Sequence, residues 1–221
     1  MLIEPDSYLY TYAITRDFGF APNPFHGFCT LATCKPRIRK AAKVGDWVMG
    51  VGGSTLGTVK GKCIFLMKIS EKIEFQNYWN DHRFSLKKPL RNGSRVQMLG
   101  DNIYHKNRDG SWIQEDSHHS NPDGSPNPIN VKRDTSSNDR VLISNCFYYF
   151  GSQAIEVDLN SIGYIKIRDF KKTDLSVSSD GRKLIEAVFN KNRRHMNMVI
   201  ADPCQFLDSH QRVDQGTGKI T

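Results

Sequence analysis

Short runs of hydrophobic and aromatic positions predict most of the strands. Residues 8–15 (YLYTYAIT) are rich in β-branched and aromatic side chains, which favour a buried strand. Residues 47–51 and residues 62–70 have the same character, and a break at residues 52–54 lies between them. We therefore expect three strands in the first third of the chain.

The second half of the chain alternates between apolar runs and polar connections. The strings NIYHK and SWIQ within residues 100–114 flank a turn, which predicts a hairpin. Residues 115–139 are polar and contain several prolines, so we expect a long loop there. Residues 141–150 predict a strand or a buried turn, and the alternation in residues 164–170 (YIKIRDF) predicts a further strand.

Two segments predict helices. Pro36 suits the first turn of a short helix, with Thr33 or Cys34 as its cap, and Gly45 ends it. The clearest helix is Asp180–Asn192, and we expect its first residue, Asp180, to cap it. One face of it is apolar, formed by Leu184, Ile185, Val188 and Phe189. Because the strands and helices show no βαβ regularity, the pattern indicates an α+β fold around a compact, barrel-like mixed sheet.

Composition narrows the class of protein. The chain has 221 residues, of which 38% are hydrophobic, enough for an ordinary core. No apolar run approaches the roughly 20 residues of a membrane span, and the N-terminus lacks the pattern of a signal peptide. Five cysteines, an odd number, do not form a secreted disulfide framework. We expect a soluble, cytoplasmic protein with reduced thiols and no membrane partner.

Charge and aromatic residues suggest a ligand. The formal charge is +8, which is typical of nucleic-acid partners but also of basic proteins without one. Aromatic and basic residues gather in the irregular stretch of residues 16–47. Single nucleobases are held by stacking on aromatic rings, and phosphates are held by basic side chains. The sequence thus favours a pocket here, although many of these aromatic residues will belong to the core.

Other chemistries have weaker signals. The glycines of residues 50–57 fit neither a P-loop nor a dinucleotide fingerprint. His26, Cys29 and Cys34 lack the paired spacing of a zinc site, so we expect no metal. A thiol–imidazole pair between one of these cysteines and His26, with Asp17, remains an alternative, because a cysteine near a helix N-terminus can have a lowered pKa. The histidine run at residues 118–119 favours a solvated loop over a general acid.

Longer strings resemble a known family. The string YTYAITRDFGFAPNPFHGFCTLATCKPRIRKAAKVGDWVMGVG resembles the nucleotide modification associated domain, second type, and YWNDHRF, GDNIY, DSHHS and LISNCFYYFG fit the same family. The GDWV string, together with Ser70-Glu71 after the next strand, resembles the PUA-like superfamily and its EVE and ASCH domains. The resemblance covers roughly residues 8–155. It implies association with systems that modify nucleic-acid bases, largely in phages and bacteria, and hence with phage defence.

The resemblance also implies a fold and a mode of binding. PUA-like domains form a mixed β-barrel with short flanking helices that binds RNA or a modified DNA base, often flipped into a pocket. We expect one such domain over residues 1–221, with a long inserted region at about residues 71–140 and a helical C-terminal extension. These two departures from a minimal EVE domain leave the lining of the pocket open.

Our leading hypothesis is a nucleic-acid-binding module that reads a modified base without a cofactor. The expected base-binding residues are Arg16, Asp17, Phe18, Phe20, Asn23, Phe25, Thr30, Thr33, Trp47 and Trp79. The expected phosphate-binding residues are Lys35, Arg37, Arg39 and Arg83, with further loop contacts from Ser117, His118 and His119. Its partner would be DNA or RNA. The alternatives are an enzyme that acts on a nucleotide or base, using Asp17, Cys29, Cys34, His118 or His119, and a binder of a free nucleotide signal.

Overall fold

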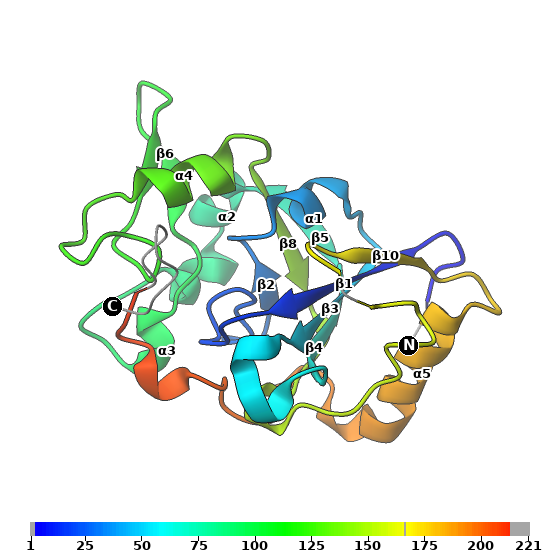
Figure 1. Ribbon diagram of the computed structural model, residues 1–221. Coiled ribbons are helices and arrows are strands. Elements are labelled where there is room, and N and C mark those ends of the chain that lie inside the picture. Colours follow the sequence, from blue (N-terminus) through cyan, green and yellow to red (C-terminus); the bar gives the residue numbers. More distant parts are fainter. Residues whose placement is uncertain (1–2, 166, 213–221) are drawn as a thin grey trace. The chain divides into compact units, whose positions relative to one another are not determined.

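The computed structural model describes residues 3–165 and 167–212, and these divide into two compact units (Figure 1). Unit 1 takes the described residues of Met1–Asp17, Ala42–Glu71 and Ser144–Cys204. Unit 2 takes those of Phe18–Ala41, Lys72–Ile143 and Gln205–Thr221. Neither unit is a continuous segment of the chain, and each has its own sheet and its own core.

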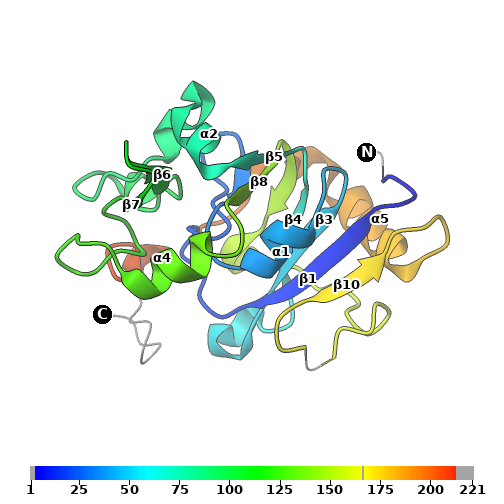
Figure 2. The same cartoon turned by 90° about the horizontal axis from the view of Figure 1, so that it is seen from above.

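Unit 1 is built on a six-stranded sheet with the order β10-β1-β3-β4-β9-β11. Its strands are β1 (Tyr8–Ile14), β3 (Trp47–Gly52), β4 (Cys63–Lys68), β9 (Cys146–Tyr149), β10 (Lys171–Asp174) and β11 (Met198–Val199). β1 runs parallel to β3, β11 runs parallel to β9, and the other neighbours are antiparallel. Figure 2 shows β4, β3, β1 and β10 side by side. The central strands have almost no exposed residues, so their sequences are apolar throughout rather than alternating.

Helix α5 (Asp180–Asn192) supplies the apolar face that completes the core of unit 1. Leu184, Ile185 and Val188 pack in one cluster with Leu9 and Trp47. Full burial of each such side chain contributes about 1.5–3 kcal/mol. Three 3₁₀ helices also belong to this unit: Ser54–Val59, Gly151–Gln153 and Arg193–His195.

Unit 2 contains shorter elements around an aromatic core. A three-stranded sheet has the order β2-β8-β5, and a separate pair forms the antiparallel hairpin β6–β7. The strands are β2 (Cys29–Leu31), β5 (Glu71–Glu74), β6 (Tyr104–Lys106), β7 (Trp112–Gln114) and β8 (Arg140–Ser144). The helices are α1 (Pro36–Ala41), α2 (Phe75–Asn80), α3 (Arg95–Met98), α4 (Pro128–Thr135) and the 3₁₀ helices His82–Lys87 and Phe206–Asp208. Figures 1 and 2 show α4 beside the β6–β7 hairpin.

The core of unit 2 is dominated by rings. Phe75 lies against Tyr104 with ring centroids 5.1 Å apart, and Tyr78 lies against Phe84 at 4.7 Å. Phe18 is part of the same cluster. Aromatic pairs at these distances stabilise a core beyond the area they bury.

The structure confirms the α+β class and most predicted elements. Strands occur in residues 8–15, 47–51 and 62–70, the hairpin lies within residues 100–114, and helix α5 has the predicted bounds. Residues 141–150 form two successive strands, β8 and β9. In the described residues both larger sheets are open and no closed barrel is found. The expectation of one domain with an insertion stays a prediction.

Three local predictions were wrong. The strand expected at residues 164–170 is absent from the described residues there, since the nearest strand begins at Lys171 and Ile165 is exposed rather than facing a core. The expected loop of residues 115–139 contains α4, which Asn127 caps and Pro128 begins. Ser179, not Asp180, caps α5. Among the described helices, none is long and apolar enough to cross a membrane.

The cap of α5 gives a prediction about stability. The Ser179 hydroxyl accepts a hydrogen bond from the Arg182 main-chain N–H at 3.2 Å. We expect Ser179→Ala to lower the free energy of unfolding by about 1 kcal/mol, because this N–H loses its partner. Ser178→Ala, at the exposed neighbouring position, is the control and should change it by less than about 0.5 kcal/mol. Equal effects in urea denaturation would contradict the assignment of the cap.

Candidate active site

Three side chains of unit 2 form a line from a thiol through an imidazole to a carboxylate. The Cys34 Sγ lies 3.6 Å from His119 Nε2, and His119 Nδ1 lies 3.2 Å from Asp134 Oδ2. Cys34 lies just before α1, His119 lies in a turn after β7, and Asp134 lies in α4. A nucleophile next to a base that a third group orients is the arrangement of thiol-dependent enzymes.

The backbone at Cys34 is held in an uncommon conformation. Its φ is +58° and that of Lys35 is +40°, in the left-handed region that favours glycine. Such residues cost about 1–3 kcal/mol each and persist only where their surroundings hold them. Here the Cys34 N–H donates to Asp134 Oδ1 at 2.9 Å, and its carbonyl accepts from Arg39 Nε at 2.9 Å. Both main-chain groups of Cys34 are therefore fixed.

Asp134 is fully buried and receives hydrogen bonds from several segments. Arg133 donates to both carboxylate oxygens at 2.9 Å, and Tyr104 donates its hydroxyl proton at 3.1 Å. Burial alone would raise the pKa of Asp134, but the hydrogen bonds from His119 and Arg133 outweigh it and lower this pKa well below its usual range. Asp134 is thus a fixed negative charge next to His119.

The charges around Cys34 favour its thiolate. Burial opposes ionisation of the thiol, but the positive charges of Arg133 and His119 outweigh it and lower the pKa of Cys34 to about 7. Burial and the positive charge of Arg133 oppose protonation of His119, yet the charge of Cys34 and the hydrogen bonds to Asp134 and Cys34 outweigh them and raise its pKa. Cys34 remains partly exposed. Near neutral pH the pair can therefore exist as a thiolate and an imidazolium.

Aromatic rings and amides hold the turn that carries His119. The Phe20 ring lies 4.6 Å from that of His119, and Phe18 lies 4.5 Å from His118. Asn130 of α4 donates to the His119 carbonyl at 2.7 Å. Burial lowers the pKa of His118 to about 3, so this histidine is neutral at physiological pH.

A second buried polar network of unit 2 lies at the base of the loop between Asn23 and Thr30. The Lys87 ammonium donates to the Asn23 side-chain and main-chain oxygens at 2.7 and 3.1 Å. Asp101 accepts from the Thr30 and Tyr78 hydroxyls at 2.6 and 2.8 Å. Burial lowers the pKa of Lys87 to about 8 and raises that of Asp101 to about 6. This network fixes the loop to residues 78–102, and it accounts for the polar groups of Asn23 and Thr30.

The structure brings together some of the residues that the sequence singled out. The rings of Phe18, Phe20, His118 and His119 form one cluster. The Ser117 hydroxyl belongs to the same turn and accepts a hydrogen bond from the His119 N–H at 3.3 Å. Phe25 contacts Phe206, and the fully buried Thr33 precedes Cys34. Lys35 is partly exposed and Arg37 is exposed, as phosphate contacts require.

Other predicted site residues are buried in the protein or hydrogen-bonded within it. Trp47 is fully buried in the core of unit 1, and Arg39 is fully buried in unit 2. Asp17 of unit 1 accepts hydrogen bonds from the Tyr149 hydroxyl and, at 3.0 Å, from the Cys204 N–H. Arg16 of the same unit is partly exposed. Trp47 and Arg39 therefore pack against other residues of the protein.

Two further predicted positions lie on the surface of unit 2. The Trp79 ring stacks on His105 with centroids 4.1 Å apart, and the Lys88 ammonium lies 3.7 Å from the centre of the Trp79 ring. Arg83 is exposed and pairs with Asp81 at 2.7 Å. Both side chains already have partners within their own unit.

The sequence did not point to Asp134, which orients His119, or to Arg133, whose positive charge lowers the pKa of Cys34. Both lie in α4, inside the segment expected to be a loop. An Asn followed by Pro at residues 127–128 is a helix-start signal that could have located this helix. In the described residues, no group of three or more His, Cys, Asp and Glu side chains is arranged to hold a metal ion.

Comparison with protein families adds an independent result. The family model described as nucleotide modification associated domain 2 matches residues 6–210. The chain belongs to this family. Membership of nucleotide modification associated domain 2 links it to nucleotide modification. No curated protein and no solved structure gives a significant match.

The lowered pKa of Cys34 predicts its reactivity. We expect the alkylation rate of Cys34 by iodoacetamide to rise with pH around a midpoint near 7, since only the thiolate reacts. In His119→Ala the midpoint should move toward the ordinary thiol value of about 8.5, because a positive charge and a hydrogen bond are lost. Peptide mass spectrometry measures the rate at each cysteine. Cys146 is the internal control, since burial raises the pKa of this partly exposed thiol. A midpoint above 8 in the unaltered protein would contradict the assigned charges.

The buried charge of Asp134 gives a prediction about pH and stability. Asp134→Asn should lower the free energy of unfolding at pH 7 by about 3–5 kcal/mol, because Arg39 and Arg133 lose their carboxylate. The pKa of Asp134 is lowered by folding, so its contribution is complete above the unfolded value of about 4 and declines progressively as pH falls from there toward the much lower folded value. The difference between the two proteins should therefore shrink in acid.

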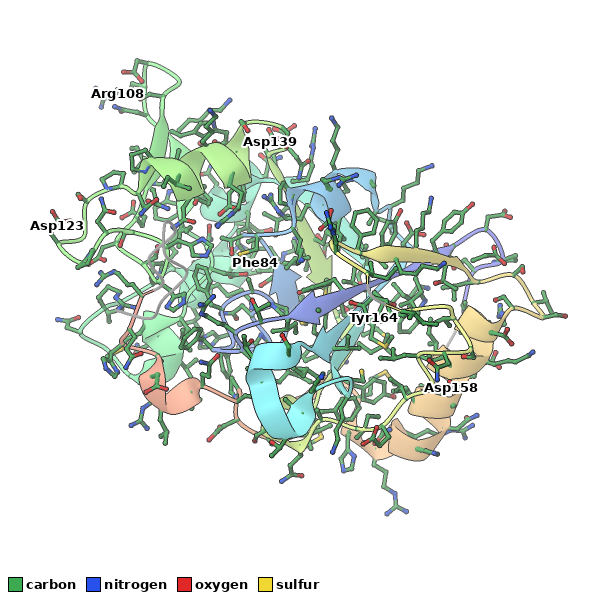
Figure 3. The ribbon with its side chains drawn as sticks, viewed as in Figure 1. Phe84, Arg108, Asp123, Asp139, Asp158 and Tyr164 are labelled. Carbon is green, nitrogen blue, oxygen red and sulfur yellow. The ribbon has the colours of Figure 1, made fainter. Side chains whose placement is uncertain are left out.

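The matched control is Asp123→Asn at an exposed loop tip of unit 2 (Figure 3). Asparagine keeps the Oδ1 atom that accepts from the Ser125 N–H and hydroxyl, so this substitution should leave the free energy of unfolding nearly unchanged at either pH. Chemical denaturation at pH 7 and pH 3.5 measures both variants. A loss in Asp134→Asn that is small, or that does not depend on pH, would show that the carboxylate is not the charge that the site depends on.

Proposed function

We propose that the protein is an enzyme that modifies a nucleotide or nucleobase by covalent catalysis at Cys34. The observation that carries this proposal is the line from Cys34 through His119 to Asp134, with its ionisable thiol. Membership of a family linked to nucleotide modification supports the class of substrate. The structural alternative is a buried ion network that only stabilises unit 2, and such a network would not require residue 34 to be partly exposed, as it is here.

Each residue of the line has a chemical role. The Cys34 thiolate attacks an electrophilic atom of the substrate, and a bond to Sγ forms as that atom releases an electron pair. The His119 imidazolium donates its Nε2 proton to the atom that receives this pair. Asp134 keeps the imidazole oriented and stabilises its positive charge. A second nucleophile, such as water deprotonated by His119, then breaks the bond to Sγ.

One contact limits which reactions fit. In many acyl-transfer enzymes, main-chain N–H groups near the nucleophile hold the developing oxyanion. The Cys34 N–H already donates to Asp134 Oδ1 at 2.9 Å, so it does not offer this proton to a substrate in the present conformation. The arrangement therefore favours attack at an electron-poor ring carbon or displacement at a substituent over simple acyl transfer.

Charge supports an anionic substrate. Residues 18–41 contain four basic residues and no Asp or Glu. Lys35 and Arg37 of this segment are partly or fully exposed and lie next to Cys34 in the chain. We propose that they contact the phosphate of the nucleotide, and that the Arg133 guanidinium, whose side chain is 30% exposed, contributes at the site itself.

A base reader without turnover is the second candidate. The observation that favours it is the tip of the loop at residues 25–28, where Phe25 and Phe28 are partly exposed on either side of a left-handed turn formed by His26 and Gly27. Such rings can stack on a flipped or modified base, as in PUA-like modules. On this proposal the fold would be PUA-like and the partner DNA or RNA.

Turnover distinguishes the two candidates. We expect incubation with a panel of canonical and modified nucleotides and oligonucleotides to give a product detectable by mass spectrometry. Cys34→Ala should abolish it, and His119→Ala should reduce the rate by about 10²–10⁴-fold, because the proton donor is lost. Cys146→Ser is the control and should retain activity. Turnover that survives in Cys34→Ala would refute covalent catalysis at Cys34, and salt-sensitive binding without turnover would favour the reader.

A further inference from the structure

We infer that Arg39 is a positioning residue that holds Cys34 and Asp134 at the separation needed for catalysis. This inference rests on the proposed function, because it assigns a role in that same site. Arg39 donates to the main-chain carbonyls of Cys34 and Asp134, so it acts through the main chain. The sequence grouped it with the exposed basic residues of α1, whereas the structure buries it completely.

The Arg39 guanidinium joins three segments of unit 2 at once. Its Nε donates to the Cys34 carbonyl at 2.9 Å, and its Nη2 donates to the Asp134 carbonyl at 2.8 Å. Its Nη1 donates to the Arg140 carbonyl at 2.8 Å. The plane of the guanidinium also lies over the Phe75 ring, 5.3 Å from its centroid. These bonds connect the residue before α1, the last turn of α4 and the start of β8.

This use of a buried cation is uncommon. A buried guanidinium is expensive unless its charge and donors are satisfied, and it is normally paired closely with a carboxylate. The Asp134 Oδ1 atom lies 3.8 Å from Arg39 Nη2, beyond hydrogen-bond distance, so carbonyl oxygens take the donors instead. The rigid fork of an arginine can satisfy three carbonyls in fixed directions, which a lysine ammonium on a flexible chain cannot.

The carbonyl that Arg39 holds belongs to the strained part of the chain. The peptide group between Cys34 and Lys35 lies between two residues with left-handed φ values. If the backbone of Cys34 shifted, its side chain would move with it and its Sγ would leave the position 3.6 Å from His119 Nε2. A displacement of about 1 Å in a reacting group can cost about 100-fold in rate. Arg39 holds the carbonyl of this peptide, and Asp134 holds the N–H of the preceding peptide, so the backbone is fixed on both sides of Cys34.

Arg39→Lys tests the inference because it keeps the charge and removes the fork. We expect the variant to fold, with the alkylation rate of Cys34 at pH 7 reduced at least 10-fold and its pH midpoint shifted upward. Lys40→Arg on the same helix is the matched control, and its exposed side chain should leave both values unchanged. Millimolar guanidinium should partly restore the alkylation rate in Arg39→Ala and have no effect on Lys40→Ala.

A second measurement needs no variant and remains informative if Arg39→Lys does not fold. In the unaltered protein, the hydrogen on Arg39 Nε should exchange slowly with solvent, as observed through the ¹⁵N NMR signal of this group. The signal should also shift with pH at the midpoint found for Cys34 alkylation. A rapidly exchanging or pH-insensitive signal, or an Arg39→Lys protein with unchanged alkylation, would overturn the inference. Neither readout uses a substrate, so a failure of the proposed enzyme activity would be seen separately.

Discussion

The buried Asp134 carboxylate is the interaction on which the candidate site depends. It binds the Cys34 main-chain N–H, the His119 ring, the Arg133 guanidinium and the Tyr104 hydroxyl, which come from four separate parts of unit 2. A buried charge is tolerated only when its oxygens are satisfied. The elements that supply these donors must therefore be in place together, so folding of unit 2 and assembly of the site are one event.

The two polar networks of unit 2 respond to burial in opposite ways. Around Asp134, dense hydrogen bonding and positive charge keep the carboxylate ionised and lower the pKa of the Cys34 thiol to about 7. Around Lys87 and Asp101, burial dominates. It lowers the pKa of Lys87 and raises that of Asp101, so it favours the uncharged form of each group. The first network thus maintains charges next to a partly exposed nucleophile. The second fixes a loop, which is a structural task that does not require strong ionisation.

Regular elements were predictable where local pattern decided them. Helix α5 and the strands of unit 1 follow apolar runs and caps that act over a few residues. Helix α4 was missed because its polar residues and the prolines before and at its start are typical of a loop. Its role depends on the buried Asp134 rather than on an apolar stripe. Membership of the nucleotide modification associated domain 2 family was predicted from longer strings and is confirmed over residues 6–210.

The site itself could be predicted only in part. Cys34 and His119 were both candidates for an enzyme, but their contact joins residues 85 positions apart, which one sequence cannot reveal. Arg39 resembles Arg37 in the sequence, yet a six-residue helix is too short for periodicity to show which of the two points inward. Burial, decided by packing against Phe75 and α4, makes this distinction.

The placement of the three tryptophans has an optical consequence. Trp47 lies in the core of unit 1, whereas Trp79 and Trp112 belong to unit 2. With Trp79 and Trp112 replaced by Phe, the remaining indole emission reports on unit 1 alone, and with Trp47 replaced it reports on unit 2. Intrinsic fluorescence can therefore follow each half of this interleaved chain separately and show whether the two melt in a single cooperative step or in succession.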